Sequence, residues 1–357
     1  MKTEYIIVGS GLAGISAAEE LRSRGLDFVV FEDESQNSSL VAGGMYNPVV
    51  LKRFNPVWKG AEQLEIALPF YKRLEERFEK TYDRRIDILR IFKSVEEQNN
   101  WFSACDKPRL KPFLVSKIEE NRNSWVHAEH MLGRVRKTGR VAVRDLVDDY
   151  RARLATEGRL RKESFQHSRL EQFEEGLKYG DLEAGKIVFC EGNGLARNPY
   201  FNKLPLEGTK GELITIHAPD LRLQEVLKSA VFVMPLGDDL YKIGATFNWT
   251  DKTNLPTEQG RQELVEKLKK VISCDFEIRE HEAGVRPTTQ DRRPLLGIHP
   301  EHPRLAVFNG LGTRGVMSAP FLARQLIDFL EEQAPLDPET DISRFSSYPL
   351  SYSERTS

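Results

Sequence analysis

The feature that most constrains this chain is a glycine-rich turn near its start, Gly9-Ser10-Gly11-Leu12-Ala13-Gly14. The apolar residues 5–8 before the turn predict a strand, and residues 15–22 after it have the spacing of a helix. A second apolar run, residues 28–31, ends at Glu32. This order and spacing match the fingerprint of a dinucleotide-binding βαβ unit. The less specific interpretation is a glycine-rich turn in an ordinary βαβ unit.

Each residue of the fingerprint has a physical role in binding a dinucleotide. Gly9 permits the tight turn, Gly11 lets a pyrophosphate approach the backbone, and Gly14 lets the helix pack closely on the strand. The N–H groups and dipole at the helix N-terminus favour phosphate. Glu32 can accept hydrogen bonds from ribose hydroxyls, and its charge disfavours a 2′-phosphate. We therefore predict cofactor contacts by the turn, including Ser10, Leu12 and Ala13, and by Glu32 and Asp33.

Length and composition limit the class of protein. A chain of 357 residues is long for a single core, so we expect two domains. No apolar run approaches the roughly 18 residues that a membrane-spanning helix needs. The three cysteines (Cys105, Cys190 and Cys274) are scattered and have no metal-binding or redox spacing. We expect reduced thiols, a cytoplasmic location and no metal site.

Basic residues outnumber acidic ones between Arg134 and Arg169. Such a stretch can attract an anionic partner such as RNA. Asp145, Asp148 and Asp149 are interleaved with the basic residues, so the simpler interpretation is a solvated helix face with its flanking loops. The sequence favours this simpler interpretation without excluding the other.

The rest of the chain predicts further helices and strands. Residues 38–48 form a loop of small residues that can lie close to a bulky planar ligand. Residues 86–135 are expected to hold short strands with excursions. The expected helices are 59–80, 143–154, 257–272 and 316–330, and the expected strands are 187–190, 213–216, 230–235, 240–245 and 306–308.

A second glycine-rich turn, Gly310-Leu311-Gly312-Thr313-Arg314-Gly315, lies between the last predicted strand and helix. No strand and acid follow it, so we do not predict a separate nucleotide site there. We expect this helix to return to the first domain and to point its N-terminus at another part of the same cofactor. A flavin suits this arrangement, because a helix N-terminus stabilises the negative charge of a reduced isoalloxazine.

Taken together, the motifs resemble those of the FAD-dependent D-amino acid oxidase superfamily, which includes glycine and sarcosine oxidases. The resemblance runs from end to end. It rests on Gly9 to Gly14, Glu32, Ala42-Gly43-Gly44, Phe189-Cys190-Glu191-Gly192, Lys210-Gly211-Glu212, Gly244-Ala245-Thr246, Ala283-Gly284-Val285-Arg286-Pro287, Asp291, Pro294-Leu295-Leu296-Gly297, Asn309 to Gly315 and Ala319-Pro320.

The resemblance implies an α/β fold, with a Rossmann-like FAD-binding domain of the glutathione-reductase type. An α+β substrate domain with a mainly antiparallel sheet completes it. We place the FAD-binding domain at residues 1–85, 140–212 and 290–357, and the substrate domain at residues 86–139 and 213–289.

The resemblance also implies FAD as the cofactor. We expect FAD to be held non-covalently, because Gly284 takes the place of the cysteine that attaches flavin in sarcosine oxidases. The implied cofactor contacts beyond the first turn, Glu32 and Asp33 are Ala42, Gly43, Gly44, Met45, Gly192, Gly310, Gly312, Thr313, Arg314, Gly315 and Val316.

The implied reaction is oxidation of the Cα–N bond of an amino acid or secondary amine, R–NH–CH₂–COO⁻. Hydride passes to flavin N5, the imine is hydrolysed, and O₂ or another acceptor reoxidises the flavin. A guanidinium can hold the substrate carboxylate with two parallel hydrogen bonds. Arg286 matches the family's carboxylate position, although a structural ion pair, for example with Glu282, is the alternative. Arg314 is a weaker candidate, and Phe232 stands where glycine oxidase has a substrate-contacting tyrosine.

Residues 44–48 and 310–320 are similar to the oxidase domain of the bifunctional enzyme that matures the wobble uridine of tRNA. Three functions therefore remain open. The favoured one is an oxidase or dehydrogenase of a small-molecule amine or amino acid. The others are removal of a carboxymethyl group from modified tRNA, and a flavoprotein without enzymatic activity. The sequence does not indicate an oligomeric state.

Overall fold

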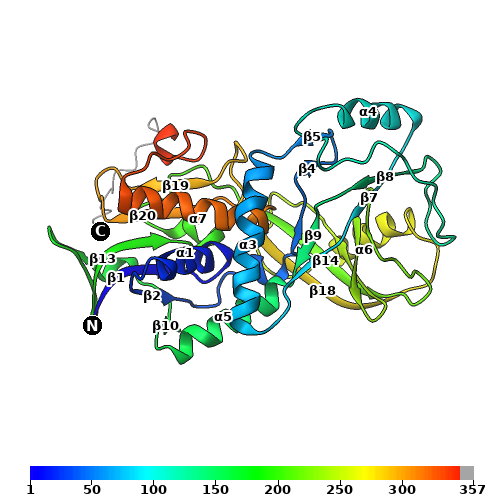
Figure 1. The fold of residues 1–357 in the computed structure, drawn as a ribbon. Coiled ribbons are helices and arrows are strands. Elements are labelled where there is room, and N and C mark those ends of the chain that lie inside the picture. The colour runs from blue at the N-terminus through cyan, green and yellow to red at the C-terminus, as the bar shows by residue number, and fades with distance from the viewer. Residues whose placement is uncertain (346–357) are drawn as a thin grey trace. The chain divides into compact units, whose positions relative to one another are not determined.

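The protein folds into two compact units, seen in a computed structural model that describes residues 1–345 (Figure 1). Unit 1 contains residues 1–40, 143–209 and those from 285 onward, and unit 2 contains residues 41–142 and 210–284. Within the described residues, no helix is long and apolar enough to cross a membrane.

Unit 1 is built on a sheet whose central strands are parallel. Its elements are β1 (Lys2–Val8), α1 (Leu12–Ser23), β2 (Phe28–Phe31), α5 (Val143–Thr156), β10 (Leu160–Arg161), β11 (Leu170–Gln172), β12 (Leu177–Tyr179), β13 (Leu182–Phe189), β19 (Leu295–Ile298), β20 (Leu305–Asn309) and α7 (Gly315–Glu332). Short 3₁₀ turns span His167–Arg169, Gly192–Arg197 and Ile342–Phe345, and the short helix α2 (Ser38–Val41) lies where unit 1 passes into unit 2.

The strand order in unit 1 is β10-β2-β1-β13-β12-β11, and β20 also pairs with β13. β1 pairs in parallel with both β2 and β13, and β13 pairs in parallel with β20. These strands are continuous apolar runs because both faces of a parallel sheet are buried. Alternate residues of the strands face one core, together with Phe165, Tyr179 and Phe201.

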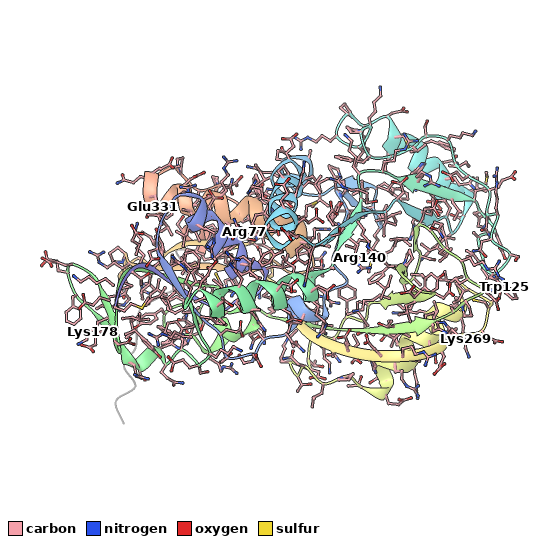
Figure 2. The ribbon with its side chains drawn as sticks, turned by 60° about the horizontal axis from the view of Figure 1, so that its bottom comes forward. Arg77, Trp125, Arg140, Lys178, Lys269 and Glu331 are labelled. Atoms are coloured by element: carbon pink, nitrogen blue, oxygen red, sulfur yellow. The ribbon has the colours of Figure 1, made fainter. Side chains whose placement is uncertain are left out.

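Helices α1 and α7 pack against each other, and α1 also contacts β1, β2 and β20 (Figure 1). The C-terminal end of α7 is tied to the sheet by Glu331, which Figure 2 labels. The Glu331 carboxylate accepts hydrogen bonds from the Tyr5 hydroxyl and from Lys186 Nζ, the latter at 2.6 Å. Helix α7 is therefore fixed to β1.

Unit 2 contains a second, mainly antiparallel sheet. Its elements are β3 (Met45–Tyr46), β4 (Val49–Val50), β5 (Asn55–Pro56), α3 (Gly60–Phe78), β6 (Asp83–Arg85), β7 (Ile88–Ile91), α4 (Val95–Cys105), β8 (Leu132–Val135), β9 (Gly139–Val141), β14 (Thr209–His217), β15 (Val226–Lys228), β16 (Phe232–Gly237), β17 (Leu240–Gly244), α6 (Glu258–Lys269) and β18 (Glu277–Arg286).

The strand order of the larger sheet in unit 2 is β18-β14-β17-β16-β15-β7-β8. One face of this sheet, including Leu89, Ile214 and Val233, forms a core with Leu264 and Leu268 of α6. This architecture and that of unit 1 confirm the predicted fold class, an α/β dinucleotide-binding fold with an additional mainly antiparallel sheet.

The division into units differs from the predicted domain boundaries. Residues 41–85 cluster with unit 2, because β3 and β6 both pair with β9 in a small sheet. Residues 285–289 cluster with unit 1. Residues 346–357 of the predicted FAD-binding domain lie outside the described residues. The identification of the units as FAD-binding and substrate domains stays a prediction.

One stretch was predicted as the wrong type of element. Residues 95–105 form helix α4, so the prediction of short strands over this part of 86–135 was wrong. The missed signal is a helix cap, because the Ser94 hydroxyl accepts a hydrogen bond from the Glu97 backbone N–H at 3.2 Å. The fully buried Trp101 then anchors the helix on Phe54 and Phe92, each with a ring-centroid distance of 5.4 Å.

We expect Trp101→Ala to lower the free energy of unfolding of unit 2 by about 3–5 kcal/mol, since it leaves a large cavity. The neighbouring Phe102 is exposed, so Phe102→Ala is a matched control in the same helix and should change stability by less than about 0.5 kcal/mol. Thermal and denaturant unfolding measure both. Equal effects of the two substitutions would contradict the packing described for α4.

Candidate cofactor and active site

Three turns of unit 1 meet around one cavity. The parallel strands β1, β13 and β20 end at the same edge of the sheet, where they lead into the turns that begin at Gly9, Glu191 and Gly310. The cavity has a volume of about 290 Å³. Predicted cofactor residues that line it are Gly9, Ser10, Gly11, Leu12, Ala13, Glu32, Asp33 and Gly192.

The first turn leaves no room for side chains at two of its glycines. Gly9 has a φ of +100°, and a Cβ there would lie 2.5 Å from the Cys190 carbonyl oxygen. A Cβ at Gly14 would lie 1.9 Å from the Gly9 carbonyl oxygen, so the close packing of α1 on the turn requires glycine. These contacts bring the N-terminus of α1 to the cavity, where its N–H groups can bind phosphate.

Ser39, which the sequence did not single out, also lines the cavity beside the first turn. Its Oγ accepts a hydrogen bond from the Leu12 backbone N–H at 3.2 Å. A Cβ at Gly11 would lie 2.9 Å from the same oxygen. Ser39 therefore occupies the N-terminal end of α1, the position where a phosphate group would compete for the same N–H.

Glu32 lies buried at the end of β2, with its carboxylate already held in place. Oε2 accepts hydrogen bonds from the Ser10 backbone N–H and lies 2.8 Å from Nη2 of Arg151, and Oε1 accepts one from the Glu34 N–H at 2.7 Å. Arg151 belongs to α5 and was counted in the sequence only as part of the basic stretch. The structure gives it the role of fixing the predicted ribose-binding acid.

The second glycine-rich turn is tied to the cavity by its own backbone and by Asn309. Asn309 Nδ2 donates to the Gly192 carbonyl at 2.9 Å, and Asn309 and Leu311 both line the cavity. The Gly312 N–H donates to the Pro287 carbonyl at 3.0 Å. This bond brings the end of β18, with Arg286, to the turn. The remaining predicted residues, Gly310, Thr313, Arg314, Gly315 and Val316, lie in this turn or the first turn of α7.

The two predicted catalytic arginines differ in their surroundings. Arg286 is half-buried at the end of β18, and burial lowers its pKa to about 10. Arg314 is exposed just before α7, where desolvation and then the charges of Arg292 and Arg293 lower its pKa. The Arg286 guanidinium is therefore charged at neutral pH. The roles of Arg286 and Arg314 in catalysis stay predictions.

The remaining predicted cofactor residues, Ala42, Gly43, Gly44 and Met45, belong to unit 2. Gly44 has a φ of +76°, and a Cβ there would lie 1.9 Å from the Val141 carbonyl oxygen. A Cβ at Gly43 would lie 3.2 Å from the Phe232 ring. The loop therefore has structural reasons for its glycines, and its contact with cofactor stays a prediction.

Cys190 is the cysteine that lines the cavity. Its burial, with a smaller contribution from Glu191, raises the pKa of the thiol well above its ordinary value. The side chain is therefore a neutral thiol at neutral pH, and it is a poor nucleophile.

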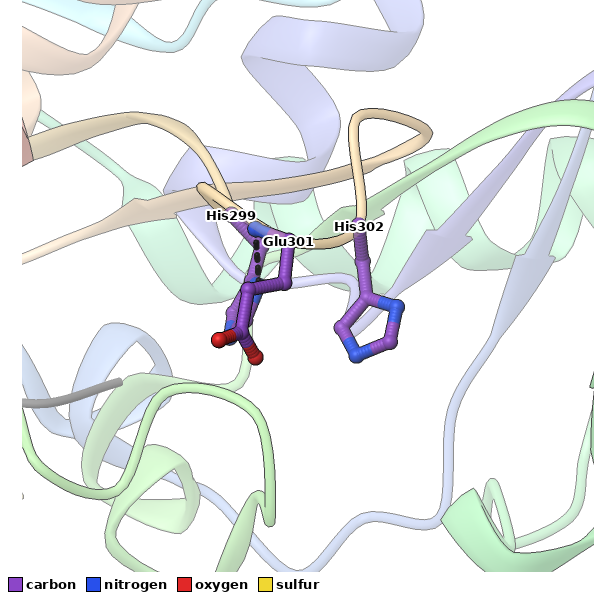
Figure 3. Close-up of side chains that lie close together, drawn as sticks. All are labelled: His299, Glu301 and His302. Carbon is purple, nitrogen blue, oxygen red and sulfur yellow. Dashed lines mark hydrogen bonds between the residues drawn. The ribbon is translucent and has the colours of Figure 1, made fainter. Parts of the chain in front are cut away.

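One cluster of metal-ligand residue types occurs among residues 1–345, at His299, Glu301 and His302 (Figure 3). Possible ligand atoms of the three lie within 4.8 Å of one another. His299 Nδ1 accepts a hydrogen bond from the Glu301 backbone N–H at 3.1 Å, so in the neutral ring Nε2 carries the proton. The two rings lie 4.7 Å apart between centroids. The cluster does not line the cavity, and we predict no metal there.

The cavity fits the adenosine diphosphate part of a dinucleotide. It offers a helix N-terminus for pyrophosphate, a buried carboxylate for ribose, and glycines that let a ligand approach the backbone. The second turn, through Asn309 and Leu311, extends the same cavity. Fold and cavity together define a dinucleotide-binding α/β protein.

Comparison with known proteins identifies the family. The family described as FAD dependent oxidoreductase (DAO) matches residues 4–329, and the chain belongs to it. The protein is therefore an FAD-dependent oxidoreductase.

Three similar proteins illustrate the range of the family. Glycine oxidase of Pseudomonas aeruginosa is 23% identical over 95% of this chain and 98% of its own length. The tRNA 5-methylaminomethyl-2-thiouridine biosynthesis bifunctional protein of Marinobacter nauticus is 23% identical over 92% of this chain, but the chain spans only 55% of that protein. The crystal structure of iminodiacetate oxidase from Chelativorans sp. BNC1 has a TM-score of 0.79 at 18% identity, covering 94% of this chain and 98% of that one.

We expect Gly14→Ala to abolish retention of FAD, since its Cβ cannot coexist with the Gly9 carbonyl and the turn must move. Gly194→Ala is the matched control, because that glycine lines the same cavity but its Cβ would meet no atom nearer than 3.6 Å. Absorbance near the flavin bands after gel filtration, with added FAD, measures retention. Retention of FAD by the Gly14 variant would contradict the predicted binding site.

Proposed function

We propose that the protein oxidises the Cα–N bond of a glycine-like amine, R–NH–CH₂–COO⁻. The observation that carries this proposal is the half-buried Arg286, held beside the second glycine-rich turn. FAD, held by the residues of the cavity, supplies the acceptor for a hydride from the substrate α-carbon. The amine loses a proton, and water then hydrolyses the imine R–N=CH–COO⁻ to R–NH₂ and glyoxylate.

Arg286 would hold the substrate carboxylate and so fix the direction of its α C–H bond. A guanidinium and a carboxylate form two parallel hydrogen bonds in one plane, which restricts the rotation of the bound substrate. Because Arg286 is half-buried, this interaction is less screened by water than an exposed ion pair. The Gly312–Pro287 hydrogen bond fixes the backbone next to Arg286.

A neutral amine can lose hydride without a side-chain base, so the residues need to bind and orient the substrate rather than remove a proton from carbon. The similar proteins named glycine oxidase and iminodiacetate oxidase support this proposal, since glycine and iminodiacetate both contain the unit N–CH₂–COO⁻. Either O₂ or another oxidant would then reoxidise the reduced FAD.

The second candidate function is the removal of a carboxymethyl group from a modified tRNA nucleoside. The similarity to the bifunctional tRNA-modifying protein favours it. The basic stretch gives it less support than the sequence indicated, because several of its arginines have acidic partners. Arg134 pairs with Glu119, Asp87 and Glu225, and Arg151, Arg153, Arg159 and Arg161 pair with Glu32, Glu157, Asp27 and Asp181.

Anaerobic spectroscopy of the FAD-loaded protein tests the proposal. We expect the flavin absorbance to bleach on addition of glycine, N-methylglycine or another N-substituted glycine. The amino alcohols in which a CH₂OH group replaces the carboxylate should not bleach it. Bleaching with none of a panel of N-substituted glycines and D-amino acids would contradict the proposal. Bleaching only by the modified nucleoside or tRNA, with salt-sensitive tRNA binding, would establish the second candidate.

We expect Arg286→Gln to lower the second-order rate constant for flavin bleaching by about 100-fold or more, because two charge-assisted hydrogen bonds are lost. Arg314→Gln tests the weaker candidate and should have a smaller effect. Arg293→Gln is the control, since that arginine forms a surface ion pair with Glu339. Stopped-flow absorbance measures all three, and an unchanged rate in the Arg286 variant would remove it from substrate binding.

The lowered pKa of Arg286 predicts a dependence on pH. The charged guanidinium binds carboxylate, so binding should be strong below the pKa and weaken as the pH rises through about 10. (Methylthio)acetate, a carboxylate without a titrating amine, is the appropriate ligand. Its dissociation constant, measured by perturbation of the flavin spectrum, should rise above that pH in the wild-type protein and show no such step in Arg286→Gln.

A further inference from the structure

Most of the charged side chains that line the cavity of unit 1 are acidic. They are Glu32, Asp33, Glu163 and Glu191. Arg197 is the only lysine or arginine among residues 1–345 that lines the cavity. Oxidised FAD carries its negative charge on the diphosphate, so the cavity has to accept an anion among carboxylates. The partners of each charged side chain therefore matter for binding.

The two carboxylates that follow β2 are held by other groups of the protein. Glu32 is fixed by Arg151 and by two backbone N–H groups. Asp33 accepts hydrogen bonds from the Ser35 backbone N–H, at 3.0 Å, and from the Ser164 hydroxyl. Both carboxylates therefore have partners of their own, and neither of them is paired with the arginine of the cavity.

Arg197 is the last residue of the 3₁₀ turn Gly192–Arg197, which follows β13. Asn198, directly after the turn, is fully buried, and its Nδ2 donates to Glu191 Oε2 at 2.6 Å. This bond joins the residue before the turn to the residue after it. The other carboxylate oxygen of Glu191 lies 3.0 Å from His167 Nε2. Both ends of the turn are thus held, and the backbone that carries Arg197 is fixed.

The Arg197 side chain is exposed, and within the described part of the chain it forms no hydrogen bond or ion pair. Arg151 differs, because its guanidinium is already committed to Glu32. A guanidinium can donate two parallel hydrogen bonds to phosphate oxygens. Arg197 therefore brings unused donors and a positive charge to the wall of the cavity.

The turn that carries Arg197 contacts the segment that leads to the N-terminus of α1. A Cβ at Gly194 would lie 3.6 Å from Gln36 Nε2, and Gln36 also lines the cavity. Three residues later, Ser39 Oγ accepts the hydrogen bond from the Leu12 N–H at the start of α1. The guanidinium of Arg197 and the helix N–H groups that can bind phosphate therefore belong to the same cavity.

We propose that Arg197 binds the diphosphate of FAD and supplies the positive charge that the other side chains of the cavity lack. The backbone N–H groups and the dipole of α1 supply the rest of the phosphate site. This inference goes beyond the proposed function, because it concerns how the cofactor is held and does not depend on which substrate is oxidised. Arg197 takes no part in the bond changes of the reaction.

Displacement of FAD from the full-length, FAD-loaded protein tests this inference. ADP-ribose contains the adenosine and diphosphate of FAD, whereas adenosine lacks the diphosphate. Each competitor is titrated into the protein, and the fluorescence of FAD in an ultrafiltrate gives the dissociation constants of FAD and of both competitors. In Arg197→Gln, we expect the constants for FAD and ADP-ribose to rise about 10-fold, because a charge-assisted hydrogen bond is lost, and the constant for adenosine to change by less than about twofold.

Arg197→Lys keeps the charge and should retain most of the affinity for ADP-ribose. Lys203→Gln is the matched control, because Lys203 is an exposed cation of unit 1 that does not line the cavity, and it should leave all three constants unchanged.

An unchanged constant for ADP-ribose in Arg197→Gln, or an equal rise in the constant for adenosine, overturns the role of Arg197. The wild-type protein gives a test that needs no variant, since ADP-ribose that binds no more tightly than adenosine also overturns it. These outcomes are independent of the proposed amine oxidation, which the bleaching of the flavin tests separately.

Discussion

The close approach of Gly14 to the carbonyl of Gly9 is the constraint on which the rest of unit 1 depends. Because residue 14 has no side chain, α1 can start directly over the end of β1. Its N-terminus then lies at the edge where β13 and β20 also end, since the three strands are parallel. The cavity is therefore a consequence of strand direction and of one glycine. The residues that line it supply the groups that can bind a dinucleotide.

The acidic partners of the basic residues determine which positive charges are neutralised. The basic stretch reads as one feature along the chain, but its arginines are divided between the two units and several are paired with acids far away in sequence. Arg151 is the clearest case, because it fixes Glu32 instead of facing solvent.

Much of the fold was predictable from local pattern. The fingerprint around Gly9, the apolar strands and the amphipathic helices α3, α5, α6 and α7 all lie close to their expected ranges. Helix α4 was missed because its apolar positions are sparse, and its helix cap at Ser94 was the available signal. Several cavity residues, such as Ser39 and Arg151, carried no local signal, since each acts through a contact with a residue distant in sequence.

The sequence by itself determined the dinucleotide-binding turn, the second glycine-rich turn and the class of cofactor, because these depend on residue types at short and fixed spacings. Only the tertiary structure decided that Asn309 and Gly312 join the second turn to Gly192 and Pro287. It also decided that Lys228 on β15 lies in register with Arg90 on β7 and Phe232 on β16. The physical reason is that hydrogen bonds, strand register and burial connect residues far apart in the chain. Spacing along the sequence does not encode those distances.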